Sequence, residues 1–306
     1  MNIDSIKVNL QYFLPKHLLT KAVGILAAAK LGKITTAAVR GFIRVYDINT
    51  AEIKENLEDF ATFNDFFARA LKPEARPIDE SADSLVFPAD GRISQFGNLC
   101  GNFQLQAKDH YFTIEALLGN KSDAAYFTDG KFMTVYLSPQ DYHRVHIPTG
   151  GKLLKMTYIP GELFSVNPLY TSNIPELFSR NERVVCLFDT DIGKMAVILV
   201  GATIVRSIAT QWAGIVAPNK SDEIYIETYE NKNISFSKGD EIGKFMMGST
   251  VICLFEKKQV DFIAGLQEKQ KTRFGQKMAV MTTPISVIKS PNKVKKKSPI
   301  RAVRNK

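Results

Sequence analysis

Two stretches near the N-terminus repeat apolar residues at the spacing of three and four that is typical of an amphipathic helix. The first covers residues 18–29 and the second residues 39–46, and in both the basic side chains lie on another face. Thr62 is a suitable N-cap for a third, short helix whose three phenylalanines are expected to pack in a core. We therefore expect residues 1–60 to be helical, and either to lie on a membrane or to cover the core of the following domain.

The pattern changes after residue 85 to short β-branched and aromatic runs separated by Gly, Pro, Asn and Asp, which is typical of strands joined by turns. The clearest runs are residues 132–137, 184–188, 196–200, 223–228 and 251–255. The chain of 306 residues is 45% hydrophobic, so it is long enough to bury a sizeable core. We expect an α+β fold in which residues 61–265 form a compact β-rich catalytic domain.

Charge is distributed unevenly along the chain. The formal net charge is +9, from 40 basic and 31 acidic residues, yet the twelve basic residues after Glu268 are accompanied by no acidic residue. Residues 266–306 are therefore expected to form a disordered basic tail. An anionic lipid surface would attract such a tail at about 1 kcal/mol per basic residue, and a merely solubilising role is equally open. No folded nucleic-acid motif accompanies the tail, so nucleic acid is not the expected partner.

The chain is expected to lie on a membrane rather than to cross it. Its longest uncharged run of helical character, residues 22–29, is far shorter than the roughly 20 residues that a span needs. The first residues do not have the pattern of a cleavable signal. The three cysteines, Cys100, Cys186 and Cys253, are widely separated and odd in number, which favours a reducing compartment without structural disulfides.

A chemically informative segment is Gly248-Ser249-Thr250, which lies between two strand-like stretches. By itself it is an ordinary turn signal. A serine hydroxyl held there can also attack the carbonyl of the preceding glycine and turn the amide into an ester. Elimination of that ester would break the chain and leave a pyruvoyl group at the new amino terminus. A pyruvoyl ketone can accept electrons from a breaking bond to a carboxylate, and its formation needs a base nearby.

Candidates for that base and its partner occur elsewhere in the chain. Two of the four histidines, His143 and His146, lie close together, and histidine titrates near neutral pH. Their spacing of three would place them on one side of a helical turn but on opposite faces of a strand. No cysteine or histidine set with metal-ligand spacing accompanies them, so no metal is expected. Asp90, in a turn-like Asp-Gly pair, could orient an imidazole.

Together these segments resemble the prokaryotic type of the phosphatidylserine decarboxylase family, whose members are pyruvoyl-dependent and self-cleaving. The resemblance extends from about residue 11 to about residue 256, with Met247 as a volume-conserving departure. It rests on Pro88-Ala89-Asp90-Gly91, residues 136–146 and Gly248-Ser249-Thr250, and is supported by residues 181–184 and 238–245.

The resemblance implies a role for each matching residue. Asp90, His146 and Ser249 would form the self-cleavage triad, in which Ser249 attacks the Gly248 carbonyl, His146 is the base and Asp90 orients it. Ser249 would then become the pyruvoyl cofactor. His143 would serve the decarboxylation and contact the substrate. Tyr136 is a weaker candidate for the same pocket, since packing on the core is an equally good interpretation of a strand tyrosine.

The implied reaction is conversion of phosphatidylserine to phosphatidylethanolamine and carbon dioxide through a Schiff base with the pyruvoyl group. The large and small chains left by cleavage would remain associated, with a homodimer as a possible assembly. The substrate lies in an anionic membrane, so the resemblance implies a peripheral protein at the cytoplasmic face of the cell membrane.

Two other classes of protein stay open at this point. A serine hydrolase could use Ser249, His146 and Asp90 in an intact chain, although the Gly-x-Ser-x-Gly sequence of the commonest such fold is missing. A carrier module resembling biotinyl or lipoyl domains would need an exposed, modified lysine at a turn. Lys244 is a poor candidate for that lysine because its neighbours have strand character.

Overall fold

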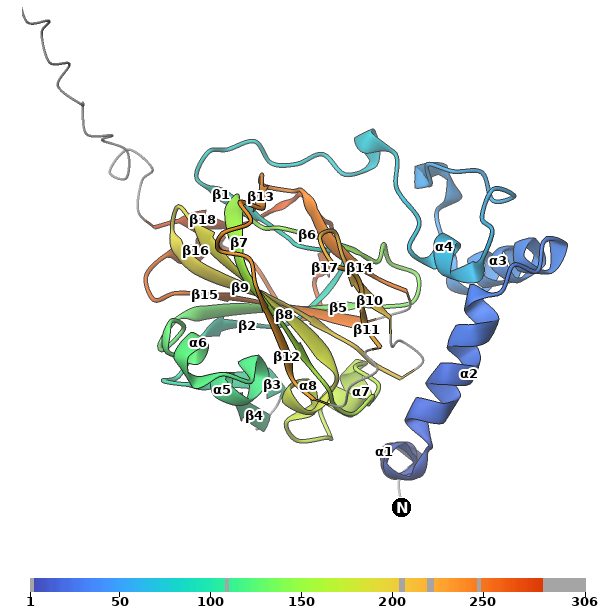
Figure 1. Cartoon of the computed structure of the whole chain (residues 1–306), viewed down its shortest axis with the longest axis horizontal. Helices are drawn as coiled ribbons and strands as arrows, with labels where there is room; N and C mark the ends of the chain where they lie inside the picture. Colours follow the sequence, from blue (N-terminus) through green and yellow to red (C-terminus); the bar gives the residue numbers. More distant parts are fainter. Residues whose placement is uncertain (1–2, 108–109, 204–206, 219–222, 247–248, 283–306) are drawn as a thin grey trace, which may run out of the picture.

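The computed structural model describes residues 3–107, 110–203, 207–218, 223–246 and 249–282. Three helices at the N-terminus extend beside a body of strands and short helices (Figure 1). They are α1 (Ile3–Phe13), α2 (Lys16–Ala28) and α3 (Lys33–Tyr46). The fold is α+β, as the sequence predicts, and both predicted amphipathic helices are confirmed as α2 and α3.

The predicted third helix is also present, as α4 (Phe63–Phe67). The Thr62 side chain accepts a hydrogen bond from the backbone N–H of Asp65, and the Asp65 carboxylate accepts one from the backbone N–H of Thr62, which is a capping box. Phe66 and Phe67 are buried, as expected for core packing.

Within the described part of the chain, no single helix is long and apolar enough to cross a membrane. Helices α2 and α3 meet the length and composition required only as a pair, and that pair is bent by 116°.

The main sheet of the described residues has nine strands, and every neighbouring pair is antiparallel. Its order is β12-β7-β8-β9-β15-β5-β2-β17, with β13 also paired to β7. The strands are β2 (Gly91–Asn98), β5 (Lys131–Leu137), β7 (Gly151–Ile159), β8 (Arg183–Thr190), β9 (Gly193–Val200), β12 (Tyr225–Thr228), β13 (Ser235–Phe236), β15 (Ser249–Phe255) and β17 (Lys271–Thr272). The five predicted strand runs are thus confirmed as β5, β8, β9, β12 and β15.

A smaller sheet of order β11-β10-β14-β6 packs on one face of the main sheet. Its strands are β6 (Arg144–His146), β10 (Ile208–Thr210), β11 (Gly214–Ala217) and β14 (Glu241–Phe245). Val145 and Phe245 from this sheet share a core with Val251 and Cys253 of β15. Since β15 is also covered on its other face, all seven of its residues are buried, which explains its almost continuous apolar sequence.

Short helices and a hairpin cover the opposite face of the main sheet. These elements are the strands β3 (Phe103–Ala107) and β4 (His110–Thr113) and the helices α5 (Ile114–Leu118), α6 (Lys121–Ala125), α7 (Pro168–Thr171) and α8 (Leu177–Arg180). Leu117 and Phe178 from this layer share a second core with Ile252 and Leu254 of β15. Side chains along β15 therefore alternate between two separate cores.

A third sheet, of order β1-β18-β16, corrects the predicted boundary of the tail. Its strands are β1 (Ser84–Val86), β16 (Val260–Phe262) and β18 (Lys277–Met281). The tail was expected from residue 266, but β17 and β18 lie beyond it, and Phe274 and Met278 are buried. The charged residues of this segment are almost all basic, but the segment also contains a short apolar run that pairs with the body. Residues 283–306 of the predicted tail lie outside the described residues.

Candidate active site

Ser249 is the first residue of β15, where its position is fixed by pairing with Leu137 of β5. Its side chain is fully buried, and its hydroxyl oxygen Oγ has no hydrogen-bond partner within the described part of the chain. A buried, unpaired hydroxyl costs about 1–3 kcal/mol and is uncommon. Gly248, the other half of the predicted cleavage site, lies outside the described residues.

His143, just before β6, is also fully buried. Its Nδ1 lies 2.8 Å from the carbonyl oxygen of Asp141, so Nδ1 carries the proton and donates it to that oxygen. The neutral ring then has its lone pair on Nε2, which has no hydrogen-bond partner among the described residues. Burial lowers the pKa of His143 to about 3, and the positive charge of Arg69 contributes in the same direction. His143 is therefore neutral at pH 7 with a free basic nitrogen.

Two backbone contacts link the segment that contains His143 to the segment that leads to Ser249. One connection joins β5 to β6 and ends at His143, and the other joins β14 to β15 and ends at Ser249. At one end Leu137 pairs with Ser249, and at the other the carbonyl of His143 accepts a hydrogen bond of 3.0 Å from the N–H of Phe245. The start of the β5–β6 connection is thus tied to Ser249, and its end is tied to Phe245 of β14. The Ser249 hydroxyl and the His143 Nε2 are both buried and unpaired within the described residues.

His146 lies in β6 and differs from His143 in that both of its ring nitrogens are occupied. Nδ1 donates to the carbonyl oxygen of Gly239 at 2.8 Å, and Nε2 lies 3.2 Å from the hydroxyl of Tyr142. The ring also stacks on Phe274, with the centroids 3.5 Å apart. Burial lowers the pKa of His146 to about 4. Both ring nitrogens and one face of the His146 ring are therefore in contact with other residues.

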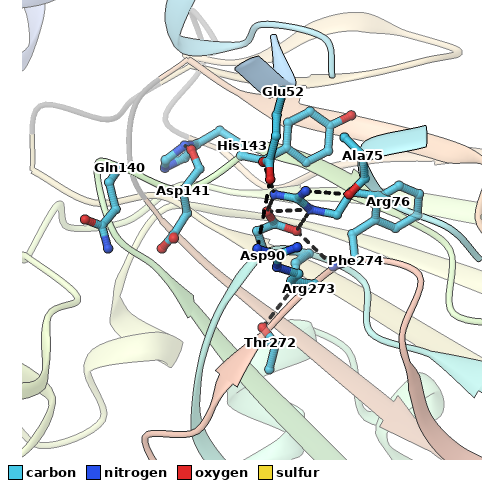
Figure 2. Close-up of polar contacts among 12 residues, drawn as sticks. Glu52, Ala75, Arg76, Asp90, Gln140, Asp141, His143, Thr272, Arg273 and Phe274 are labelled. Carbon is cyan, nitrogen blue, oxygen red and sulfur yellow. Dashed lines mark hydrogen bonds and ion pairs between the residues drawn. The ribbon is translucent and has the colours of Figure 1, made fainter. Parts of the chain in front are cut away.

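Asp90 is held chiefly by Arg76, as Figure 2 shows. The Arg76 Nε lies 3.0 and 2.9 Å from the two carboxylate oxygens, and Nη2 lies 2.5 Å from one of them. Asp90 also accepts a hydrogen bond of 2.9 Å from the backbone N–H of Phe274. Arg76 forms a second ion pair, with Glu52 at 2.9 Å. The carboxylate is therefore satisfied by a guanidinium and a backbone amide.

No hydrogen bond within the described residues joins Asp90, His146 and Ser249 to one another. Phe274 links the first two, because its backbone binds Asp90 and its ring covers His146. Neither Phe274 nor Arg76 was identified from the sequence. Phe274 lies in the segment predicted to be a tail, and Arg76 carries no local signal that would separate it from other basic residues.

Tyr136 lies on β5 with its side chain partly buried, and it packs against the second core. Burial raises the pKa of its hydroxyl, and the nearby Asp141 and Tyr46 raise it further. Tyr136 therefore contacts the core, while its hydroxyl lies near Asp141. Within the described part of the chain, no group of three His, Cys, Asp or Glu side chains could hold a metal ion.

A polar cavity of about 220 Å³ adjoins these residues. In Figure 2, Gln140 and Asp141 lie on one side of this region and Asp90, Arg76 and Arg273 on the other. The full lining consists of Asp47, Ile48, Asn49, Glu52, Arg69, Leu71, Arg76, Asp90, Gln140, Asp141, Tyr142, Lys271 and Arg273. The cavity therefore collects residues from the N-terminal segment, from the β5–β6 connection and from the C-terminal segment.

Known proteins match both this body and the helices before it. A family model described as phosphatidylserine decarboxylase matches residues 63–280, and a second one, described as PSD, matches residues 6–47. The chain belongs to the phosphatidylserine decarboxylase family. A phosphatidylserine decarboxylase proenzyme of Shewanella sediminis is 52% identical over 283 residues, which cover 90% of this chain and 99% of that protein. A proenzyme of the same description from Alteromonas mediterranea is 51% identical, with coverage of 90% and 86%.

Membership of the phosphatidylserine decarboxylase family confirms the resemblance drawn from the sequence and makes the protein a carboxy-lyase. The relatives are described as proenzymes, which implies an enzyme that is processed.

Proposed function

We propose that this protein splits its own chain between Gly248 and Ser249 and then converts phosphatidylserine to phosphatidylethanolamine and carbon dioxide. The observation that carries the proposal is the pair of buried, unpaired atoms at the site, Ser249 Oγ and His143 Nε2. A nucleophile and a base of the right protonation state are what an amide-to-ester rearrangement needs.

In the splitting reaction, the Ser249 oxygen attacks the Gly248 carbonyl carbon while His143 Nε2 takes the hydroxyl proton. The bond between that carbon and the Ser249 nitrogen breaks, and the nitrogen takes up a proton, so the amide becomes an ester. Loss of the Ser249 α-proton then expels the Gly248 carboxylate. Water replaces the resulting enamine nitrogen, which leaves as ammonia, and a pyruvoyl group remains on the small chain.

The surroundings of Ser249 suit such a group. A ketone there would supply an electron sink for the electrons of the bond to the departing carboxylate. His143 Nε2 would take up the proton that the substrate ammonium group loses when it reacts with the ketone, and would return it to the substrate carbon after carbon dioxide leaves. Its Nε2 is free for this, and its orientation is fixed by Asp141. The apolar core around Ser249 would exclude water, which favours loss of an unsolvated carboxylate.

We infer that His143 is the base for splitting, which differs from the resemblance-based role of His146, and the hydrogen-bond pattern supports this. The free lone pair belongs to His143, whereas the ring nitrogens of His146 contact Gly239 and Tyr142. In this proposal Asp90 and His146 are positioning residues that hold the segment around Phe274 against the body.

The two chains produced by splitting would remain associated because both contribute to the same sheets. In the small chain, β15 pairs with β5 of the large chain along its whole length and with β9 from Thr250 to Phe255. Strands β17 and β18 pair with β2 and β1 of the large chain. Separation would expose two cores at once, which the hydrophobic effect opposes strongly.

We also propose that the N-terminal helices lie on the cytoplasmic face of the cell membrane. Large apolar side chains on these helices face solvent in the isolated chain, including Phe13, Leu18, Ile25, Leu26 and Ile34. An anionic bilayer containing the substrate would cover them, and the basic residues on the same helices would favour that surface.

The test is the intact mass of denatured protein together with decarboxylation of phosphatidylserine vesicles. The wild type is expected to give fragments of residues 1–248 and 249–306, the smaller of which reacts with borohydride. Ser249→Ala is expected to give one uncut, inactive chain. Ser122→Ala, at an exposed serine, is the matched control and should be cut and active. An active wild-type chain that stays uncut would exclude the proposal and favour a serine hydrolase.

A further inference from the structure

Arg69 is the most unusual side chain in the wall of the polar cavity. It is only 4% exposed, yet its donors Nε and Nη1 have no hydrogen-bond partner among the described residues. Its third nitrogen, Nη2, donates to the backbone carbonyls of Gln140 and Asp141 at 3.0 and 3.2 Å. The guanidinium is therefore fixed by one nitrogen, while two further donors are buried and unsatisfied.

Three of the four carboxylates in the cavity wall are engaged elsewhere. Asp90 and Glu52 are both paired with Arg76. The Asp141 carboxylate accepts hydrogen bonds of 2.7 Å from the N–H and from the hydroxyl of Ser138. A buried arginine with two free donors is costly for the folded protein unless a ligand satisfies them.

Nη2 belongs to both bidentate edges of a guanidinium, so the free Nε and Nη1 of Arg69 lie on different edges. Each can donate one hydrogen bond to an oxygen of an anion such as a carboxylate or a phosphate. Lys271 and Arg273 line the same cavity and add positive charge. Arg69 is also close to the proposed reaction centre, because its charge contributes to the low pKa of His143, and that histidine binds the carbonyl of Asp141 as Arg69 does.

We infer that Arg69 binds the phosphate group of the substrate, and that the polar cavity is the phosphate subsite of the enzyme. The inference rests on the proposed function and adds the headgroup contact to it. Pairing of Arg69 with the α-carboxylate would oppose the reaction, since it would stabilise the negative charge that leaves with carbon dioxide. The phosphodiester keeps its charge throughout, so binding there holds the headgroup without favouring the reactant.

The first test compares the kinetics of Arg69→Met with those of the wild type on short-chain phosphatidylserine. Arg69→Met is expected to split normally, as judged by intact mass, and to raise KM about 10- to 100-fold, the effect of losing a charged hydrogen-bonded contact. Arg92→Gln removes an exposed arginine that donates to the carbonyl of Lys269 and should match the wild type. A fall in kcat with an unchanged KM would overturn the inference, because Arg69 would then act only by positioning His143.

The second test does not depend on splitting or activity. Inorganic phosphate is titrated by calorimetry into Ser249→Ala and into the double variant Ser249→Ala/Arg69→Met. Binding that weakens at least tenfold in the double variant supports the subsite, even if Arg69→Met fails to split. Absent binding in Ser249→Ala, or equal binding in both proteins, overturns it.

Together the two tests separate a headgroup site from a site for free phosphate. If phosphate binding requires Arg69 but the KM for phosphatidylserine does not change, the cavity binds free phosphate and the headgroup assignment is wrong. A wild-type protein that neither splits nor decarboxylates would defeat the proposed function, while the titration would still decide whether Arg69 binds phosphate.

Discussion

At the scale of single residues, His143 and His146 lie three positions apart in the chain but differ in their hydrogen-bond partners. Both rings are buried, and burial lowers both pKa values well below the usual range. Only His143 keeps a nitrogen without a partner within the described residues, whereas His146 is fixed by Gly239, Tyr142 and Phe274. Since both are neutral at pH 7, the free lone pair and not the pKa distinguishes the base that we propose.

This difference predicts opposite outcomes for two alanine variants. His143→Ala should slow chain splitting by about 10²- to 10⁴-fold, the usual contribution of a positioned base. His146→Ala should still split, but it should unfold at a lower temperature because the stacking with Phe274 is lost. The checks are intact mass against time and thermal unfolding.

The resemblance-based assignment makes the reverse prediction for the same variants. A folded His146→Ala protein that stays uncut, beside a His143→Ala protein that splits, would restore His146 as the base. His17→Ala is a suitable control, since His17 is an exposed residue of α2.

At the scale of elements, the junction between β2 and β5 explains why a glycine follows Asp90. A Cβ atom at Gly91 would collide with the backbone carbonyl of Tyr136 on the neighbouring strand. The close approach lets β2 start directly after the Asp90 turn and pair with β5. The Asp-Gly pair is thus a requirement of strand packing as well as a turn signal.

Gly91→Ala is therefore expected to destabilise the protein by about 1–3 kcal/mol, as overpacking of a close contact usually does. Gly41→Ala is the matched control, because a Cβ at this position in α3 would meet no atom within 4 Å. It should be neutral or stabilise the helix by up to about 1 kcal/mol. Denaturant unfolding in a Ser249→Ala background measures both, since that background should be a single uncut chain. Equal stability of the two glycine variants would contradict the prediction.

At the scale of the whole molecule, the N-terminal helices and the β-rich body differ in how far they bury their apolar side chains. The body encloses two large cores on the two faces of one sheet. Helices α1 to α3 instead leave many apolar side chains in solvent. An apolar groove of about 250 Å³ between α2 and α3, lined by Leu26 and Ile34 among others, adds to this surface.

Ile25→Glu should therefore weaken binding to anionic vesicles by roughly tenfold or more, because one fully buried Ile contributes about 1.5–3 kcal/mol. Ile215→Glu is a matched control: Ile25 and Ile215 are each 65% exposed, but Ile215 lies on β11 of the body. Cosedimentation with phosphatidylglycerol vesicles measures binding without turnover of a substrate. Equal binding of Ile25→Glu and wild type would argue against the helices as the membrane surface.

Local patterns were sufficient to predict the main elements and to propose the reacting residues. Spacing of apolar residues predicts α2, α3 and the strands around β15, since burial of one or both faces leaves a period in the sequence. The side chains Ser249, His143, His146 and Asp90 could be selected because their chemistry and the family resemblance identify them without coordinates. The end of the folded domain was predicted wrongly, because charge was counted over a segment whose few apolar residues pair at long range.

What the tertiary structure alone decided is which of these side chains have partners. Arg69, Arg76 and Phe274 carry no local pattern that marks them, yet they surround the cavity, Asp90 and His146. The free nitrogen of His143 is likewise invisible in the sequence. Hydrogen-bond satisfaction depends on residues that are far apart in the chain and meet only after folding, whereas periodicity and side-chain chemistry are properties of the chain itself.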